Sequence, residues 1–126
     1  MVDTRTKIIE LEQMRERLLA PAPPRVLVLG HFDPVVYTNA ARMRQLAAEY
    51  GPLAVCITSP VDPLLPARAR AELAAALDCT DFVTIADHGD TAILTSIPGL
   101  TVIDESHDDL RRREALMTLV RERQKA

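Results

Sequence analysis

The sequence predicts an α/β fold, a doubly wound parallel sheet of the Rossmann type, and three observations lead to it. Val26 to Leu29 form a continuous apolar run without alternation, which is typical of a strand covered on both faces. Segments with strand and helix patterns alternate along the rest of the chain. Apolar residues make up 48% of the composition and aromatic residues only 3%, which favours helices on a parallel sheet over a β-sandwich.

The length of 126 residues suits one compact domain. Residues 1–24 are predicted to form an N-terminal helix and a proline-rich connector, and residues 25–126 the α/β domain. Apolar residues have helical spacing from Thr4 to Ala20, and Pro21-Ala22-Pro23-Pro24 ends that helix because proline blocks its continuation. We expect the helix to pack beside the domain or against a second copy.

The segments after the first strand complete the predicted sheet. Strands are predicted at 52–58, 81–86 and 100–103, and helices at 38–50, 66–77, 90–96 and 107–125. Right-handed crossovers then give the strand order 3-2-1-4 in three α/β/α layers. In the last helix, Arg111-Arg112-Arg113 is interpreted as a solvated face because acidic residues balance it. The residues of that helix expected to be buried are Leu110, Leu116, Met117, Leu119 and Val120.

In this strand order, ligands bind outside the carboxyl ends of the first and fourth strands. Those ends carry residues 30–33 and 104–107. Gly30 lets the backbone approach a ligand closely, and Thr38 or Asn39 can cap the helix that follows. The free N–H groups and the dipole of that helix start suit a phosphate. The predicted nucleotide- or phosphate-binding residues are Gly30, His31, Phe32, Asp33, Thr38 and Asn39.

Three residues of this stretch also have plainer interpretations. His31 is either a phosphate donor or an ordinary polar residue of the turn, and the second is favoured. Asp33 is expected to fix the turn by bonding backbone N–H groups rather than to take part in catalysis. Tyr37 either fills a phosphate position or lies on the surface.

Other polar residues receive structural roles or none. His31, Asp104 and His107 are the candidates for a metal site because the topology brings them to one crevice, but their spacing matches no recognised metal motif, and no metal is predicted. Arg68 and Arg70 either hold an anion or form salt bridges, and salt bridges are favoured. The two cysteines, Cys56 and Cys79, lack CxxC spacing and are given no role.

The stretch Leu27-Val28-Leu29-Gly30-His31-Phe32-Asp33 resembles the first strand and Gly-x-Phe-Asp turn of the cytidylyltransferase-like nucleotidyltransferases, most closely those of the ADP-heptose synthase group. Residues 66–77 are similar to the family's Pro-Leu-x-x-Arg-Ala-x-x-Leu-x-x-Leu helix. Residues 78–83 resemble its Cys-Val-Asp-x-Val segment, and residues 87–91 its Asp-x-Asp-Thr loop. The resemblance covers most of the chain.

The resemblance implies a commonly dimeric protein that transfers a nucleotidyl group from ATP or CTP to a sugar phosphate or an alcohol phosphate, assisted by Mg²⁺. The family's His-x-Gly-His signature donates to the α-phosphate, and the matching positions here are Val36-Tyr37-Thr38-Asn39. Losing one such donor typically costs about 10²–10³ in rate, so the loss of both histidines predicts little activity. The family's lysine has no counterpart in the loop at 59–65. Its late Ser/Thr-rich motif has none either, and the domain is therefore expected to be C-terminally shortened.

We therefore expect a nucleotidyltransferase-like pseudoenzyme, a non-catalytic module that binds a nucleotide or phosphate or acts in assembly. One alternative is an active nucleotidyltransferase in which His31, Asn39 and Mg²⁺ take over the chemistry. A second is a structural dimer module that uses Thr4 to Ala20 and the last helix. The net charge of −3 favours neither a nucleic-acid nor a membrane partner, and no secretory signal is visible. A cytoplasmic homodimer is expected.

Overall fold

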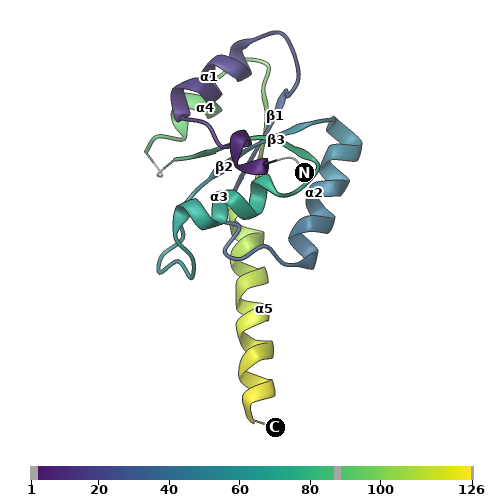
Figure 1. Ribbon diagram of the computed structural model, residues 1–126, viewed down its shortest axis with the longest axis vertical. Helices are drawn as coiled ribbons and strands as arrows, with labels where there is room; N and C mark the ends of the chain where they lie inside the picture. Colours follow the sequence, from purple (N-terminus) through teal and green to yellow (C-terminus); the bar gives the residue numbers. More distant parts are fainter. Residues whose placement is uncertain (1–2, 87–88, 126) are drawn as a thin grey trace.

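The computed structural model describes residues 3–86 and 89–125 (Figure 1). Asp87 and His88, which belong to the loop matched at 87–91, lie outside the described residues. The elements in chain order are a 3-10 turn at Thr4–Lys7, α1 at Leu11–Leu19, β1 at Val26–Gly30, α2 at Tyr37–Tyr50, β2 at Leu53–Ile57, α3 at Ala67–Ala75, β3 at Thr80–Ile85, α4 at Ala92–Thr95, β4 at Thr101–Asp104 and α5 at Ser106–Lys125.

The four strands form one parallel sheet in the order β3-β2-β1-β4, which confirms the predicted fold class and strand order. In β1, Val26 pairs with Leu53 of β2 and with Thr101 of β4, so the first strand lies between the second and the fourth. All five residues of β1 are buried, as its continuous apolar sequence predicts. The carboxyl ends of β1 and β4 therefore lie side by side.

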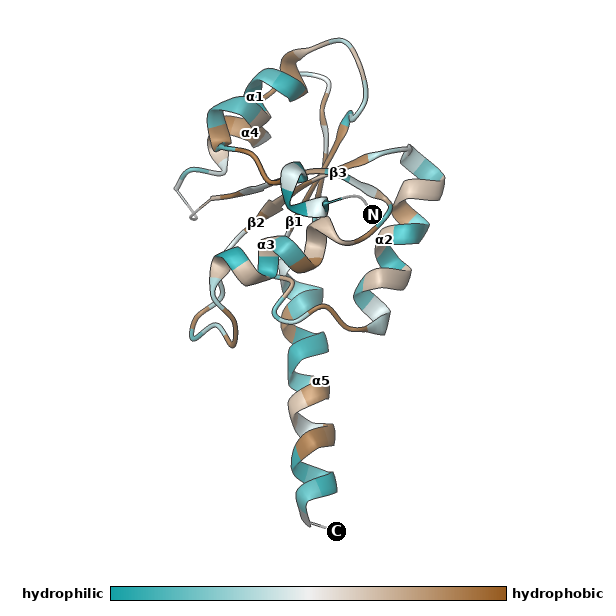
Figure 2. Cartoon of the chain, viewed as in Figure 1, coloured by the Kyte–Doolittle hydropathy of each residue, from teal (hydrophilic) through white to brown (hydrophobic). Residues whose placement is uncertain are grey.

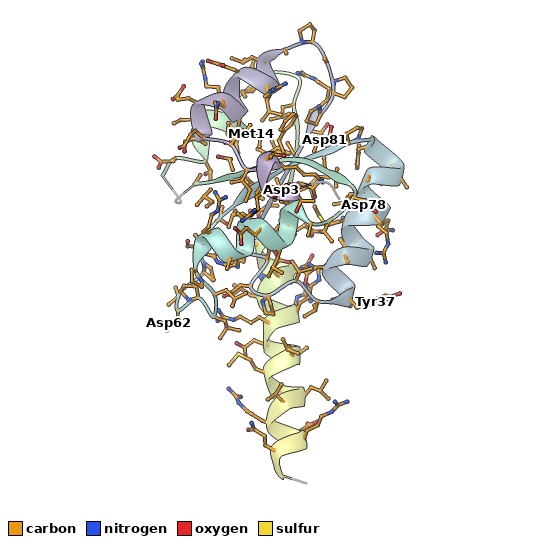
Figure 3. All side chains as sticks on the ribbon, viewed as in Figure 1. Asp3, Met14, Tyr37, Asp62, Asp78 and Asp81 are labelled. Carbon is orange, nitrogen blue, oxygen red and sulfur yellow. The ribbon has the colours of Figure 1, made fainter. Side chains whose placement is uncertain are left out.

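Helices cover both faces of the sheet. Alternate residues of a strand point to opposite faces, so each face of β1 contributes its own apolar side chains to a cluster. Val26 and Val28 pack in a cluster with apolar residues of α2 and α3. Leu27 and Leu29 pack in a second cluster, with Met14 and Leu18 of α1 and with residues around α4. Figure 3 labels Met14 where α1 lies against the sheet. The predicted three-layer arrangement is present.

The N-terminal segment is not the single helix predicted over Thr4 to Ala20. Between the 3-10 turn and α1 the chain is extended, and Ile8 forms a parallel bridge with Val83 of the edge strand β3. The N–H of Ile9 donates to the carbonyl of Val83 at 2.8 Å. Two β-branched residues thus cover part of an open sheet edge, and the backbone bonds gained there outweigh the helical pattern. Since Met14 and Leu18 are fully buried, α1 packs on its own domain.

The last helix, α5, projects from the body of the domain (Figure 1). The prediction that its five apolar residues are buried was wrong: Leu110, Leu119 and Val120 are 36%, 45% and 46% exposed, and Leu116 and Met117 are only partly covered. The helix runs past the edge of the sheet, so nothing in the domain lies opposite its second half. Figure 2 shows hydrophobic residues along this projecting part. Among the described residues, no helix is long and apolar enough to cross a bilayer.

Candidate functional site

The turn after β1 lies at the predicted switch point and is buried. The side chains of His31, Phe32 and Asp33 belong to residues that are only 5%, 1% and 4% exposed. Phe32 adopts a left-handed backbone conformation with φ of 51°, which is costly for an aromatic residue and here accompanies complete burial of its ring. At Gly30, a Cβ atom would lie 2.7 Å from Oδ2 of Asp109, so this position requires glycine for a close approach.

The group that approaches Gly30 is the carboxylate of Asp109, from the first turn of α5. Its Oδ2 accepts the backbone N–H of His31 at 2.9 Å and, more weakly, that of Phe32 at 3.5 Å. Its Oδ1 accepts Nδ2 of Asn39 at 2.6 Å and the guanidinium of Arg112 at 2.9 Å. Three predicted ligand-binding residues therefore donate to a carboxylate of the chain itself.

Asp109 is 5% exposed, and this burial raises the pKa of its carboxyl group because the charged form loses solvation. The N–H of His31 and the guanidinium of Arg112 act in the opposite direction, since both stabilise the carboxylate. A buried carboxylate is tolerated where hydrogen-bond donors surround it. The donors around Asp109 satisfy this condition.

The start of α2 differs from the predicted cap. The helix begins at Tyr37, with Val36 as the residue before it, so Thr38 and Asn39 lie inside the first turn. Oδ1 of Asn39 accepts the backbone N–H of Val36 at 3.0 Å, which is the reach-back half of a capping box. Asn39 is 3% exposed and both ends of its amide are occupied, whereas Thr38 is exposed.

Asp33 bonds backbone N–H groups, as predicted, but in a different segment from the one expected. Its carboxylate accepts the N–H of Leu64 at 2.7 Å and that of Leu65 at 2.8 Å, both in the loop before α3. Arg113 of α5 lies 3.4 Å from the same carboxylate. Asp33 thus joins the β1 turn, this loop and α5.

Arg68 forms the salt bridge that was favoured for it, whereas no salt bridge of Arg70 is found within the described part of the chain. Arg70 is 1% exposed and donates to the carbonyls of Thr58 and His31 at 2.8 and 3.2 Å, so it joins the ends of β1 and β2. Arg68 is exposed and lies 3.5 Å from Glu72. The buried carbonyl contacts of Arg70 were not expected from the sequence.

The candidate metal residues are not brought together. His31 is buried, whereas Asp104 and His107 are exposed, and Oδ1 of Asp104 accepts the N–H of Ser106 at the start of α5. Within residues 3–86 and 89–125, no group of three or more histidine, cysteine, aspartate or glutamate side chains could hold a metal ion. Glu105, the neighbour of Asp104, is buried and pairs with Arg42 of α2 at 2.6 Å.

An open groove of about 510 Å³ lies beside the filled turn, between the start of α2 and one side of α5. Val36, Tyr37 and Thr38 line one wall. The other wall is formed by residues of α5, namely Asp108, Arg111, Arg112, Ala115, Leu116 and Leu119. Tyr37 is 79% exposed and therefore lies on the surface; Figure 3 labels it at the amino end of α2.

Sequence reasoning missed the part that Asp109 and its ion-pair partner Arg112 play in this site. Arg112 and Arg113 were assigned to a solvated helix face, with Asp109 among the acidic residues that balance it. The side chains of Asp109, Arg112 and Arg113 are only 3%, 18% and 14% exposed. The solvated interpretation holds for Arg111, which is 70% exposed. The i, i+3 spacing of Asp109 and Arg112 indicates a helical ion pair. It carries no sign of a partner 78 residues earlier in the chain.

The fold and the site together define a Rossmann-like α/β protein whose switch-point turn is filled by a carboxylate from its last helix. A scan of protein-family models and a search of curated proteins find no match to this chain. The resemblance to the nucleotidyltransferases, like the residues proposed to bind a nucleotide, stays a prediction.

Proposed function

We propose that this chain is a non-catalytic, nucleotidyltransferase-like module that binds a phosphate-bearing ligand, such as ATP or CTP with its Mg²⁺, in the groove between α2 and α5. The observation that carries the proposal is the meeting of three features in one groove: the amino end of a 14-residue helix, two arginines and an apolar wall. The first suits a phosphate, the second adds positive charge, and the third can cover a base or a sugar.

Each part of a nucleotide has a counterpart in this groove. The backbone N–H groups of Tyr37 and Thr38 lie in the first turn of α2 and point out of the helix. Arg111 is exposed and pairs only with Asp108 among the interactions found, so it can turn toward a phosphate. The exposed ring of Tyr37 is available for stacking on a base.

The absence of catalysis in this proposal rests on Val36 and Asn39. Nucleotidyl transfer requires donors that strengthen their bonds to the α-phosphate as charge develops there. The side chain of Val36 has no polar atom, and the amide of Asn39 is already bonded to Asp109 and to the N–H of Val36. Neither residue is available to replace the histidines of the family signature.

Titration calorimetry with ATP and CTP, with and without Mg²⁺, tests the binding. We expect saturable binding that weakens in Arg111→Gln and is unchanged in Arg121→Gln, a matched change on the same helix outside the groove. We expect no pyrophosphate release with sugar phosphates or alcohol phosphates. Binding of neither nucleotide would overturn the proposal, and pyrophosphate release that disappears in Asn39→Ala would establish the active enzyme instead.

Assembly is a second candidate function, supported by the exposed apolar residues of α5. Because α1 packs on its own domain, α5 remains as the contact element, and the partner proposed is a second copy of this chain. The first turn of α5 carries Asp108, and its last turns carry Arg121 and Arg123. An antiparallel pair of α5 helices would place these opposite charges beside each other and cover Leu119 and Val120.

Light scattering after size exclusion tests the dimer. We expect a dimer for the wild type, a monomer for Val120→Glu, and an unchanged dimer for Val61→Glu, which changes a residue that is 84% exposed in a loop outside α5. A wild-type monomer at all concentrations would exclude this second candidate and leave the nucleotide proposal in place.

A further inference from the structure

The Asp109 carboxylate occupies an oxyanion site that the rest of the domain builds. Two of its donors are consecutive backbone N–H groups, those of His31 and Phe32, and a third is the amide of Asn39. These three belong to the segment from β1 to α2, whereas the carboxylate belongs to α5. Consecutive N–H groups that converge on one point are a general anion-binding arrangement in proteins.

The site is shaped for a close anion as well as lined with donors. At Gly30, any side chain would meet Asp109 Oδ2 within 2.7 Å, so the glycine leaves the space that the oxygen fills. Without Asp109, the backbone N–H groups of His31 and Phe32 and the amide of Asn39 would lose their carboxylate acceptor in a buried place. Unpaired buried donors are unfavourable, so the empty site would attract another oxyanion.

The helix that supplies Asp109 is held mainly by polar contacts. Arg42 pairs with Glu105 just before α5, and Arg113 donates to the carbonyl of Asp62 at 3.1 Å and lies near Asp33. Nε of Arg113 is buried and lacks a partner in the described structure. Beyond Arg113 the helix leaves the body, as Figure 1 shows, and none of residues 114–124 is fully buried. Such an element can open without unfolding the sheet.

We infer that α5 is a latch, by which we mean a helix that can be released from the domain. Asp109 holds α5 in place by occupying the oxyanion site of the β1 turn. A small oxyanion of the phosphate class that binds to the same donors displaces Asp109 and releases the helix. The carboxylate and the free anion exclude each other, because each needs the N–H groups of His31 and Phe32. The inference rests on these contacts alone. Nucleotide binding in the outer groove is a separate proposal, and its failure would leave this inference unaffected.

Hydrogen exchange of α5 in the full chain, with inorganic phosphate as the probe, tests the latch. In the wild type, we expect phosphate to speed exchange of residues 110–120 several-fold more than chloride at the same ionic strength, with exchange of β2 unchanged. In Asp109→Ala, we expect exchange of α5 to rise at least about tenfold without phosphate, since the loss of a charged hydrogen-bond network typically exceeds that factor. Glu114→Ala, a change at an exposed residue of the same helix outside the groove, is the matched control.

Phosphate should also raise the melting temperature of Asp109→Ala more than that of the wild type or Glu114→Ala, because only Asp109→Ala offers an empty site. Equal shifts in all three proteins would mean an adventitious ion only and would overturn the inference. Wild-type α5 that exchanges equally in phosphate and chloride would also overturn it, and this measurement needs no variant. If Asp109→Ala does not fold, the comparison of phosphate and chloride in the wild type decides alone.

Discussion

Nδ2 of Asn39 lies 2.6 Å from Oδ1 of Asp109, and this contact joins the start of α2 to the first turn of α5. The same amide accepts the N–H of Val36 through its oxygen. One buried side chain therefore fixes the amino end of one helix and the position of another. This double role makes Asn39 a structural residue, whatever ligand the neighbouring groove takes.

Replacing Asn39 with alanine should destabilise the domain by about 2 kcal/mol, because a hydrogen bond to a charged group is lost and the N–H of Val36 loses its acceptor. The control is Thr38→Ala, an exposed change in the same helical turn, for which we expect a change within about 0.5 kcal/mol. Urea unfolding followed by circular dichroism measures both. Equal stabilities of the two variants would contradict the structural role of Asn39.

Arg70→Met should be more damaging than its position on a helix with alternating arginines suggests. The change keeps an apolar stem but leaves the carbonyls of Thr58 and His31 without their buried donor, and we expect a loss of about 3 kcal/mol. Arg68→Met, two residues earlier, removes only an exposed pair with Glu72 and should cost less than about 0.5 kcal/mol. The measurement is the difference between the free energies of unfolding of the two variants. Equal values would contradict the role of Arg70 in joining the ends of β1 and β2.

The fold could be predicted from local patterns, since the buried strand β1 and the alternation of strands and helices are properties of short segments. The structure of short β-branched segments was harder to predict. Ile8 and Ile9 fit a helical pattern, but they bond to Val83 at the sheet edge. The burial of residues in the last helix, α5, was the hardest feature to predict. Apolar spacing in α5 predicted burial of Leu119 and Val120, but burial depends on what lies opposite, and the helix extends beyond the sheet.

The site was predictable in part. Gly30 and the turn after it were found because strand ends at a switch point bind ligands in many α/β folds. The group that fills the turn was not found, because Asp109 is far from His31 in the sequence and sits among other charged residues. A single sequence shows which donors face a crevice. It does not show which of several carboxylates reaches them.

Gly30→Ala tests how closely Asp109 and Phe32 approach the backbone. A Cβ atom there would lie 2.7 Å from Oδ2 of Asp109 and 2.8 Å from the Phe32 ring, so one of them must move. We expect a loss of about 2 kcal/mol, within the usual cost of overpacking. Gly89→Ala is the matched control, because no described residue beyond its chain neighbours lies within 4 Å of its Cβ position. Thermal melts of both variants provide the comparison, and an unperturbed Gly30→Ala protein would refute the close approach.

Cys56 should resist alkylation in the folded protein. The residue is fully buried in β2, and burial raises the pKa of its thiol to about 12, so almost no thiolate exists near neutral pH. Burial also raises the pKa of Cys79, but that residue is partly accessible and should react sooner. Mass spectrometry after iodoacetamide treatment at about pH 8 measures the order of modification. Rapid labelling of Cys56 without denaturant would show that β2 opens far more readily than a central strand should.

The raised pKa of Asp109 predicts how stability depends on pH. The carboxyl group of Asp109 binds its proton more tightly in the folded protein than in the unfolded chain, where an aspartate has a pKa of about 3.9. The contribution of Asp109 to stability is therefore fully present below about pH 4 and is lost as pH rises through the higher folded pKa. Arg112 is the charged group in contact with the carboxylate. Urea unfolding of the wild type and Asp109→Asn at several pH values should show the stability of the wild type, relative to the variant, decreasing as pH rises. If the difference instead increases, the donors of His31 and Arg112 outweigh desolvation, and the carboxylate is stabilised by its site.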